Sequence, residues 1–303
     1  MRLVTRSDFD GLVCGMLLMK KNAIDSWKFV HPKDLQDGLF EASENDILAN
    51  VPYVEGCGMW FDHHASEQAR LGDKLDVPGK RVICDSAAHI IYDYYGGEEA
   101  FPGAYEMIMA IDKVDSAKLS IDEILNPTGW VLIGFLTDPR TGLGRFRDFT
   151  VPNYKLMEEL LIDCNDMSAD EILALPDMVE RVELYNEQSA LFKKMLQDKT
   201  QIFGNVIVTD LRDVDVINAG NRFMIYSLFP EQNVSLWVVD GRGKVNVSIA
   251  TGYSVINRTC DKDIGSLMLS YDGGGHKQVG TCQVAHDDAD KVIKQIVDHL
   301  FEK

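Results

Sequence analysis

Two short acidic stretches contain the residue types that bind divalent cations. Asp8 and Asp10 lie in the run Ser-Asp-Phe-Asp-Gly, and Asp62, His63 and His64 follow one another directly. Carboxylate oxygens combined with imidazole nitrogens suit manganese, zinc or magnesium. Two such ions about 3.5–4 Å apart activate water and stabilise the entering and leaving oxygens of a phosphoryl transfer. The residues therefore predict a metal centre, although an Asp-x-Asp-Gly turn by itself is more typical of a surface turn.

Both stretches follow short apolar runs that are typical of buried strands. Since the carboxyl ends of parallel strands meet at one edge of a sheet, the two stretches are expected to lie close together. Strands alternating with helices predict an α/β fold with a mostly parallel sheet and helices on both faces. We expect strands at 2–5, 27–30, 46–49, 59–61 and 81–84, and helices at 11–21, 86–95 and from 102 towards 111.

The next segment adds acidic and basic candidates. Asp112 and Asp115 follow the helix that begins near residue 102, and the sequence leaves open which of them faces the metal. Arg140, Arg145 and Arg147 then occur within eight residues of an acidic chain. These arginines fit a solvated loop paired with neighbouring acids and fit a phosphate contact equally well. Arg140 and Arg145 are kept as candidate phosphate ligands.

The second half predicts a helical connection and a smaller mixed α/β domain. Residues 153–199 have a helical pattern, with a capping box at 168–171. Strands are expected at 202–209, 234–239, 244–249 and 280–284, and helices at 219–228, 263–270 and 287–302. The predicted domains are residues 1–150, a helical linker over 151–200, and residues 201–303.

Three consecutive glycines before a histidine are the main ligand-binding candidate of this second half. The glycines expose backbone amides and allow an oxyanion to approach, and the histidine can donate a further hydrogen bond. A flexible loop between a helix and a strand is the alternative. Donors nearby in the sequence favour binding, so the candidate anion ligands are Gly273, Gly274, Gly275, His276, Arg258 and Ser248.

Composition excludes several classes of partner. The chain has 303 residues, 46% of them hydrophobic, which is enough for two domains with cores of their own. A net charge of -18 disfavours duplex DNA and anionic membranes, which are bound by clustered Lys and Arg. The six cysteines are scattered and form no C-x-x-C pair, the amino terminus is charged, and no long apolar run occurs. These features predict a cytoplasmic protein. A homodimer is kept as an option.

Four motifs together resemble the DHH phosphoesterases that have a DHH-associated carboxyl-terminal domain. They are Asp-Phe-Asp-Gly at 8–11, Asp-His-His at 62–64, the acidic cluster at 112–115 and Gly-Gly-Gly-His at 273–276. That family includes manganese-dependent exopolyphosphatases, oligoribonucleases, cyclic-dinucleotide phosphodiesterases and single-strand exonucleases. The resemblance implies a Rossmann-like catalytic domain, a smaller substrate domain and an active site between them.

The resemblance also implies roles by position. Asp8 and Asp10 would bind different metal ions, and His63 with an acid of the 112–115 cluster would complete the second metal site. Asp62 would hold or orient that site. His64 would lie beside the substrate and its leaving group, while the glycine run would bind the part of the substrate that is not transferred.

The sequence departs from the family pattern at the first metal site. Members have His or Asp two or four residues before Asp-x-Asp, where this chain has Arg6 and Val4, and Asn50 stands where a bridging aspartate is usual. Asn50 stays a candidate metal ligand through its one neutral carbonyl oxygen, but an asparagine cannot supply an anionic bridge, and Asp46 lies at the wrong end of its strand. We predict one firmly bound ion, which would be manganese or else magnesium or zinc. The second ion would be weakly bound, substrate-assisted or absent. Arg6 would then contact the substrate phosphate in place of that second ion.

The predicted activity is that of a metal-dependent phosphoesterase or phosphoanhydride hydrolase. Its substrate would be a small linear anion such as a polyphosphate end, a short oligonucleotide or a dinucleotide, with His64, Asp62 and Arg6 acting in catalysis. The alternative is a non-catalytic nucleotide- or phosphate-binding regulator with an incomplete first metal site.

Overall fold

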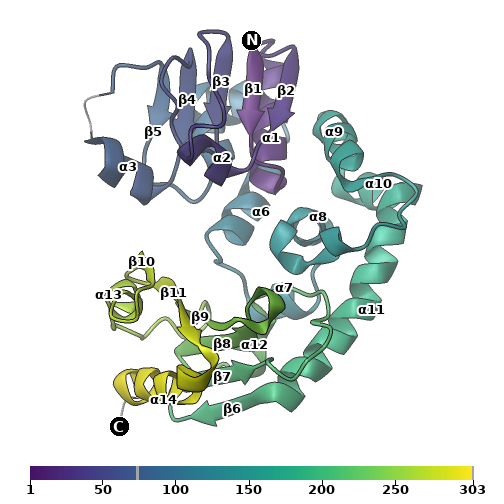
Figure 1. The fold of residues 1–303 in the computed structure, drawn as a ribbon. Coiled ribbons are helices and arrows are strands. Elements are labelled where there is room, and N and C mark those ends of the chain that lie inside the picture. Colours follow the sequence, from purple (N-terminus) through teal and green to yellow (C-terminus); the bar gives the residue numbers. More distant parts are fainter. Residues whose placement is uncertain (73–74, 302–303) are drawn as a thin grey trace. The chain divides into compact units, whose positions relative to one another are not determined.

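A computed structural model describes residues 1–72 and 75–301. Its internal contacts divide the chain into two compact units (Figure 1). The first unit comprises Met1–Lys118 and Asn126–Tyr185, and the second comprises Leu119–Leu125 and Asn186–Lys303. The domain limits expected from the sequence, with a separate linker over 151–200, stay a prediction. Within the described part of the chain, no helix has both the length and the apolar character needed to span a membrane.

The first unit is built on a five-stranded parallel sheet in the order β2-β1-β3-β4-β5. From β1 the chain moves to β2 on one side and then returns to β3 on the other side. The order therefore reverses between β1 and β3, and ligands of open α/β sheets bind at the carboxyl ends of the strands beside such a reversal. The strands are β1 (Arg2–Thr5), β2 (Ser26–Phe29), β3 (Asp46–Ala49), β4 (Met59–Asp62) and β5 (Gly79–Arg81).

Helices cover both faces of this sheet, as expected. On one face Leu3 packs near Gly15 of α1 (Phe9–Lys20), where a Cβ would lie 2.6 Å from Leu161 of α9 (Asn153–Asp163). On the other face Val4 and Leu48 join a core with Leu35 of α2 (Pro32–Gln36). Strands buried on both faces need near-continuous apolar sequence, which is why these short runs predicted them.

The remaining helices of the first unit include those that contribute to the site. They are α3 (Ala65–Leu71), α4 (Ala87–Tyr94), α5 (Gly97–Ala100), α6 (Tyr105–Asp115), α8 (Gly129–Thr137) and α10 (Ala169–Leu173), and α11 (Pro176–Lys199) has residues in both units. The capping box at the start of α10 is confirmed. The strand expected at 81–84 lies instead at Gly79–Arg81, where a left-handed glycine (φ 112°) approaches the backbone of Trp60.

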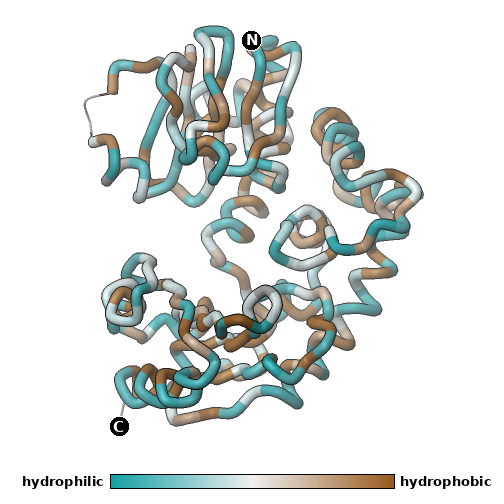
Figure 2. The backbone as a smooth tube through the Cα atoms, viewed as in Figure 1, coloured by the Kyte–Doolittle hydropathy of each residue, from teal (hydrophilic) through white to brown (hydrophobic). Residues whose placement is uncertain are grey.

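The second unit contains a six-stranded mixed sheet in the order β10-β11-β9-β8-β7-β6, in which only the β7–β8 pair is parallel. Its core joins strand residues to α13 and α14, and hydrophobic and hydrophilic residues alternate along α14 (Figure 2). The elements are α7 (Ile121–Leu125), β6 (Thr200–Phe203), β7 (Val206–Asp210), α12 (Met224–Leu228), β8 (Val234–Asp240), β9 (Asn246–Tyr253), α13 (Ile264–Leu269), β10 (Gly274–His276), β11 (Val279–Ala285) and α14 (Ala289–Leu300).

Two local predictions in this unit were wrong. The single strand expected at 202–209 is the hairpin β6–β7, which turns at Gly204 with φ 59°. The helix expected from 219 begins only at Met224, because the Asn221 side chain accepts a hydrogen bond from the Phe223 amide in the turn before it. The glycine run, for which a flexible loop was the alternative to anion binding, forms the short strand β10.

The ion pair of Arg2 with Asp46 yields a stability prediction. Arg2 Nε lies 2.7 Å from Asp46 Oδ1, and the Ser43 amide donates to Asp46 Oδ2 at 2.8 Å. Burial raises the pKa of Asp46, but these hydrogen bonds outweigh it and hold the pKa below its usual range. Ionised Asp46 therefore stabilises the fold above the unfolded-state pKa of about 3.9, and this contribution is lost as the pH falls through the folded-state pKa.

We expect Asp46→Asn to lower the free energy of unfolding by about 1–2 kcal/mol at pH 7. In urea titrations the difference from the wild type should shrink below about pH 4. An equal difference at pH 7 and pH 3 would contradict an ionic origin.

Candidate active site

Side chains from three elements meet near the carboxyl edge of the parallel sheet. Asp10 lies in α1, His63 directly follows β4, and Asp115 is the last residue of α6. His63 Nε2 lies 3.2 Å from Asp115 Oδ2 and 3.7 Å from Asp10 Oδ2. One ligand atom from each residue lies within 4.8 Å of the other two. Ligands placed about 2.1 Å from a shared ion are roughly 3–4 Å apart, so this cluster fits one cation.

The orientation of His63 also fits a metal ligand. Its Nδ1 lies 3.2 Å from the backbone oxygen of Cys84, and because a carbonyl can only accept, Nδ1 must donate. The lone pair is then on Nε2, which is buried and has no hydrogen-bond partner in the described part of the protein. A backbone carbonyl that fixes the ring in this way is the usual outer partner of a metal-binding histidine. A bound cation would satisfy the unpartnered nitrogen.

Asp10 is held by the first turn of α4. Its Oδ2 accepts from the Ala87 amide at 2.9 Å and its Oδ1 from the Ala88 amide at 2.7 Å. Burial nevertheless raises the pKa of Asp10 well above its usual range; His63 lowers it, while Asp115 and Asp8 raise it further. A cation between these groups would restore the ionised form, since metal binding and deprotonation of the ligands are linked.

The structure distinguishes Asp112 from Asp115. One oxygen of Asp112 accepts from Ser86 Oγ at 2.7 Å, and the other lies 2.5 Å from His89 Nδ1. Asp112 is thus occupied by two side-chain partners, and Asp115 is the acid beside His63. The sequence left this choice open because the two residues lie three apart on one helix, and therefore on the same face.

Asp8 accepts hydrogen bonds at Oδ1, whereas its Oδ2 is buried with no hydrogen-bond partner among the described residues. Asn50, whose backbone is left-handed (φ 57°), directs its side-chain nitrogen to Asp8 Oδ1 at 3.0 Å, and the Gly11 amide donates to the same oxygen at 3.0 Å. The orientation of the Asn50 amide follows from chemistry, because only its nitrogen can donate to a carboxylate. Arg6 Nε lies 3.1 Å from Asp8 Oδ2. The guanidinium of Arg6 therefore lies beside the carboxylate expected to bind a first metal ion.

Asp46 pairs with Arg2 at the opposite end of the strands, as its position in the strand had indicated.

Asp62 interacts with His64. His64 Nδ1 lies 2.9 Å from Asp62 Oδ1, and the His64 amide donates to Asp62 Oδ2 at 3.1 Å. Burial lowers the pKa of His64, but the hydrogen bond and charge of Asp62, with Asp115 and Asp10, raise it overall. Asp62 thus orients His64, whose side chain is 40% exposed and has Nε2 available for a ligand.

A small cavity adjoins the cluster. Asp8, Asp10, Asp115 and Arg140 all line it. Arg140 Nε is held by Asp138 Oδ1 at 2.8 Å, which fixes the guanidinium at the edge of the cavity. Arg145 is not among the residues that line this cavity; its Nε donates to the Gly142 carbonyl at 3.2 Å. The arginine cluster of the sequence is thus divided, with only Arg140 beside the carboxylates.

The glycine run of the second unit has a packing role in addition to its exposure. A Cβ on Gly273 or Gly275 would lie 2.2 Å from a carbonyl oxygen of β11, so the close approach to β11 requires glycine at these two positions. Gly274 has open space, and His276 is exposed at the sheet edge. Ser248 pairs with Gln283 two strands away from β10.

The remaining predicted donor, Arg258, lies in the loop after β9. Its Nε donates to the Val255 carbonyl at 3.0 Å. Arg258 thus has a local partner, and the predicted role of Arg258 and Ser248 in anion binding stays a prediction.

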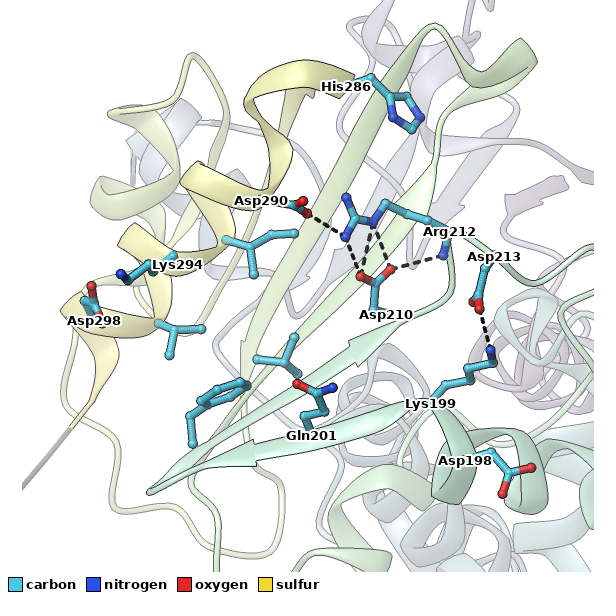
Figure 3. Close-up of a pocket in the computed structure, with 14 residues that line it drawn as sticks. Asp198, Lys199, Gln201, Asp210, Arg212, Asp213, His286, Asp290, Lys294 and Asp298 are labelled. Atoms are coloured by element: carbon cyan, nitrogen blue, oxygen red, sulfur yellow. Dashed lines mark hydrogen bonds and ion pairs between the residues drawn. The ribbon is translucent and has the colours of Figure 1, made fainter.

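Another cavity of the second unit lies between the β6–β7 hairpin and α14 (Figure 3). Its main cations are already paired with acids. Arg212 contacts Asp210 at 2.6 Å and Asp290 at 2.8 Å, and Lys199 contacts Asp213 at 2.6 Å. None of the residues proposed from the sequence lines this cavity.

Comparison with solved structures identifies the family. The "pGpG-specific phosphodiesterase" PggH from Vibrio cholerae is 45% identical, with a TM-score of 0.88, over 99% of this chain and 98% of its own. The chain belongs to the DHH phosphoesterase family. As a DHH protein it is a phosphoric ester hydrolase, so the predicted family, two-part α/β fold and enzyme class are confirmed.

More distant DHH-like structures share the fold. An exopolyphosphatase-related protein from Bacteroides fragilis is 12% identical, with a TM-score of 0.53, over 98% of this chain and 91% of its own. The exonuclease RecJ bound to manganese is 13% identical, with a TM-score of 0.52, over 99% of this chain and 90% of its own. No family model and no curated protein matches the chain.

Several groups that shape this DHH site had not been expected from the sequence. They are the Cys84 carbonyl, the Ala87 and Ala88 amides, and the side chains of Ser86 and His89. Only Ser86 had a sequence signal, since a serine before a helical pattern is a typical N-cap. The backbone groups have none, because any residue type supplies a carbonyl or an amide.

Proposed function

We propose that this protein hydrolyses the phosphodiester bond of a short linear oligonucleotide, with a dinucleotide such as pGpG as the first substrate to test. The observation that supports a hydrolytic site most directly is the unpartnered His63 Nε2 beside the carboxylates of Asp10 and Asp115. The substrate class rests on the 45% identity with PggH. Polyphosphate has less support, because the exopolyphosphatase-related structure is only 12% identical and shares the fold alone.

The proposed cofactor is one divalent cation held by Asp10, His63 and Asp115. One imidazole and two carboxylates suit manganese or zinc better than magnesium, which prefers an all-oxygen shell. When bound, such an ion lowers the pKa of a water molecule and stabilises negative charge on phosphoryl oxygens. Arg6 and Arg140 would contact the phosphate from the Asp8 side, where a guanidinium already lies beside the carboxylate.

His64 is proposed to protonate the leaving oxygen. Asp62 holds the Nδ1 proton of His64, which directs Nε2 to the substrate, and the raised pKa of His64 increases its protonated fraction near neutral pH. We expect His64→Gln to lower kcat by about 10²–10⁴-fold while manganese affinity, measured by calorimetry, stays unchanged. The wild-type rate should fall as the pH rises through the pKa of His64, and the variant should not show this decrease in its pH–rate profile. An unchanged kcat would remove His64 from this role.

The function is tested by incubating the purified protein with pGpG, other dinucleotides, p-nitrophenyl phosphodiesters and polyphosphate, with and without manganese. We expect manganese-dependent release of mononucleotides from the dinucleotides. If the protein released phosphate from polyphosphate and hydrolysed no other substrate, polyphosphate would replace the oligonucleotide as the assigned substrate.

A regulator that binds without hydrolysis is the alternative, and the Arg6 and Asn50 side chains around Asp8 favour it. Saturable pGpG binding with no turnover on any substrate would support this alternative.

A homodimer also remains a proposal, to be checked by measuring the mass of the protein in solution.

A further inference from the structure

A buried hydrogen-bonded network joins α4 to α6 beside the proposed metal ligands. Asp112 is 5% exposed and Ser86 is fully buried. Ser86 Oγ donates to Asp112 Oδ1 at 2.7 Å and accepts from the His89 amide at 3.0 Å, while His89 Nδ1 lies 2.5 Å from Asp112 Oδ2. One carboxylate of α6 thus holds both the N-cap residue of α4 and a side chain one turn further along that helix.

Each end of this network leads directly to a different proposed ligand. Ser86 is immediately followed by Ala87 and Ala88, whose amides hold the two oxygens of Asp10. Asp112 is followed three residues later, on the same face of α6, by Asp115. The contact between Ser86 and Asp112 therefore fixes the amides that orient Asp10 relative to the helix that presents Asp115.

We propose that Asp112, together with Ser86 and His89, is a positioning residue that sets the separation of the Asp10 and Asp115 carboxylates required to hold the cation. The inference rests on the proposed metal centre. Asp112 contacts neither the cation nor the substrate; it acts through the α4 amides and through Asp115. Outer partners of metal ligands typically change metal affinity by about 10–100-fold when they are removed.

The test measures manganese affinity by calorimetry, and the electron paramagnetic resonance spectrum of bound manganese, for matched pairs of variants. Asp112→Asn is compared with Asp46→Asn, which alters an equally buried carboxylate of the same unit that binds Arg2 and Ser43. Ser86→Ala is compared with Ser168→Ala, which removes the N-cap of α10. Ser86→Thr retains a hydroxyl group and a good N-cap.

We expect Asp112→Asn and Ser86→Ala to weaken manganese binding by about 10–100-fold and to alter the spectrum. Asp46→Asn and Ser168→Ala should match the wild type, and Ser86→Thr should restore most of the affinity. Equal losses in the test and control variants would overturn the inference, because the effect would then be general destabilisation.

Unchanged affinity in Ser86→Ala would also overturn it, and this comparison decides the matter if Asp112→Asn does not fold. A wild-type protein that binds no manganese would overturn the proposed metal centre and this inference with it. Tight wild-type binding that is unaffected in both test variants would overturn this inference alone.

Discussion

Replacement of His63 by alanine is expected to abolish tight manganese binding and to lower kcat/KM by at least about 10³-fold, since a catalytic ion contributes several kcal/mol of transition-state stabilisation. The Nε2 atom of His63 lies between the carboxylates of Asp10 and Asp115, and it is the only nitrogen of the cluster. Without it, the buried Asp10 and the half-buried Asp115 would face each other with no neutral ligand. The ion content of the purified protein and a calorimetric titration with manganese measure the effect.

The matched control is His299→Ala, which removes an exposed histidine on α14 of the second unit. It should bind manganese and turn over substrate as the wild type does. Thermal unfolding of the metal-free proteins tests whether the His63 variant keeps its fold. Full activity in a folded His63→Ala protein would refute the assignment of the cluster as a metal site.

The double variant Arg6→His, Asn50→Asp is expected to bind two manganese ions per chain where the wild type binds one. The change removes the guanidinium next to Asp8 and places an anion where the Asn50 amide now donates. Both changes favour a divalent cation by simple electrostatics, and an imidazole is a suitable further ligand. Aspartate tolerates the left-handed backbone of residue 50 nearly as well as asparagine does.

Stoichiometry is measured by metal analysis after gel filtration, and a magnetically coupled ion pair would appear in the paramagnetic resonance spectrum. Asn50→Asp alone should remain at one ion, because Arg6 would pair with the new carboxylate. Manganese should raise the thermal stability of the double variant more than that of the wild type, since it relieves the repulsion between two buried acids. Two tightly bound ions in the wild type would contradict the predicted loss of the first site.

The first unit was easier to predict from sequence than the second for a physical reason. Its central strands β1, β3 and β4 are largely buried, so short apolar runs mark them, and β1 and β3 have the expected bounds. In the second unit, the β6–β7 hairpin is a nearly continuous stretch of strand-forming residues with a turn at Gly204. The two-residue Gly204-Asn205 loop is itself a hairpin signal, but the strand-forming residues on both sides of it favour the expectation of one continuous strand.

Residue types identified the candidate site better than they identified its contacts. Asp10, His63 and Asp115 were all among the candidates, yet the choice between Asp112 and Asp115 depended on which acid Ser86 and His89 occupy. Such a choice requires tertiary contacts between residues 26 and 23 positions apart. In the same way, the spacing of the glycine run could not distinguish an exposed loop from a closely packed edge strand.

The left-handed backbone at Asn50 has an evolutionary consequence. Asparagine and aspartate both adopt this conformation and differ by one heavy atom in the side chain, and their codons differ by one base. A lineage can therefore exchange a neutral donor for an anionic bridge at the end of β3 without rebuilding the chain around it. Arg6 lies directly after β1. On the proposed function, a few point mutations at positions 6 and 50 would separate a centre that uses a guanidinium from one that uses a second ion.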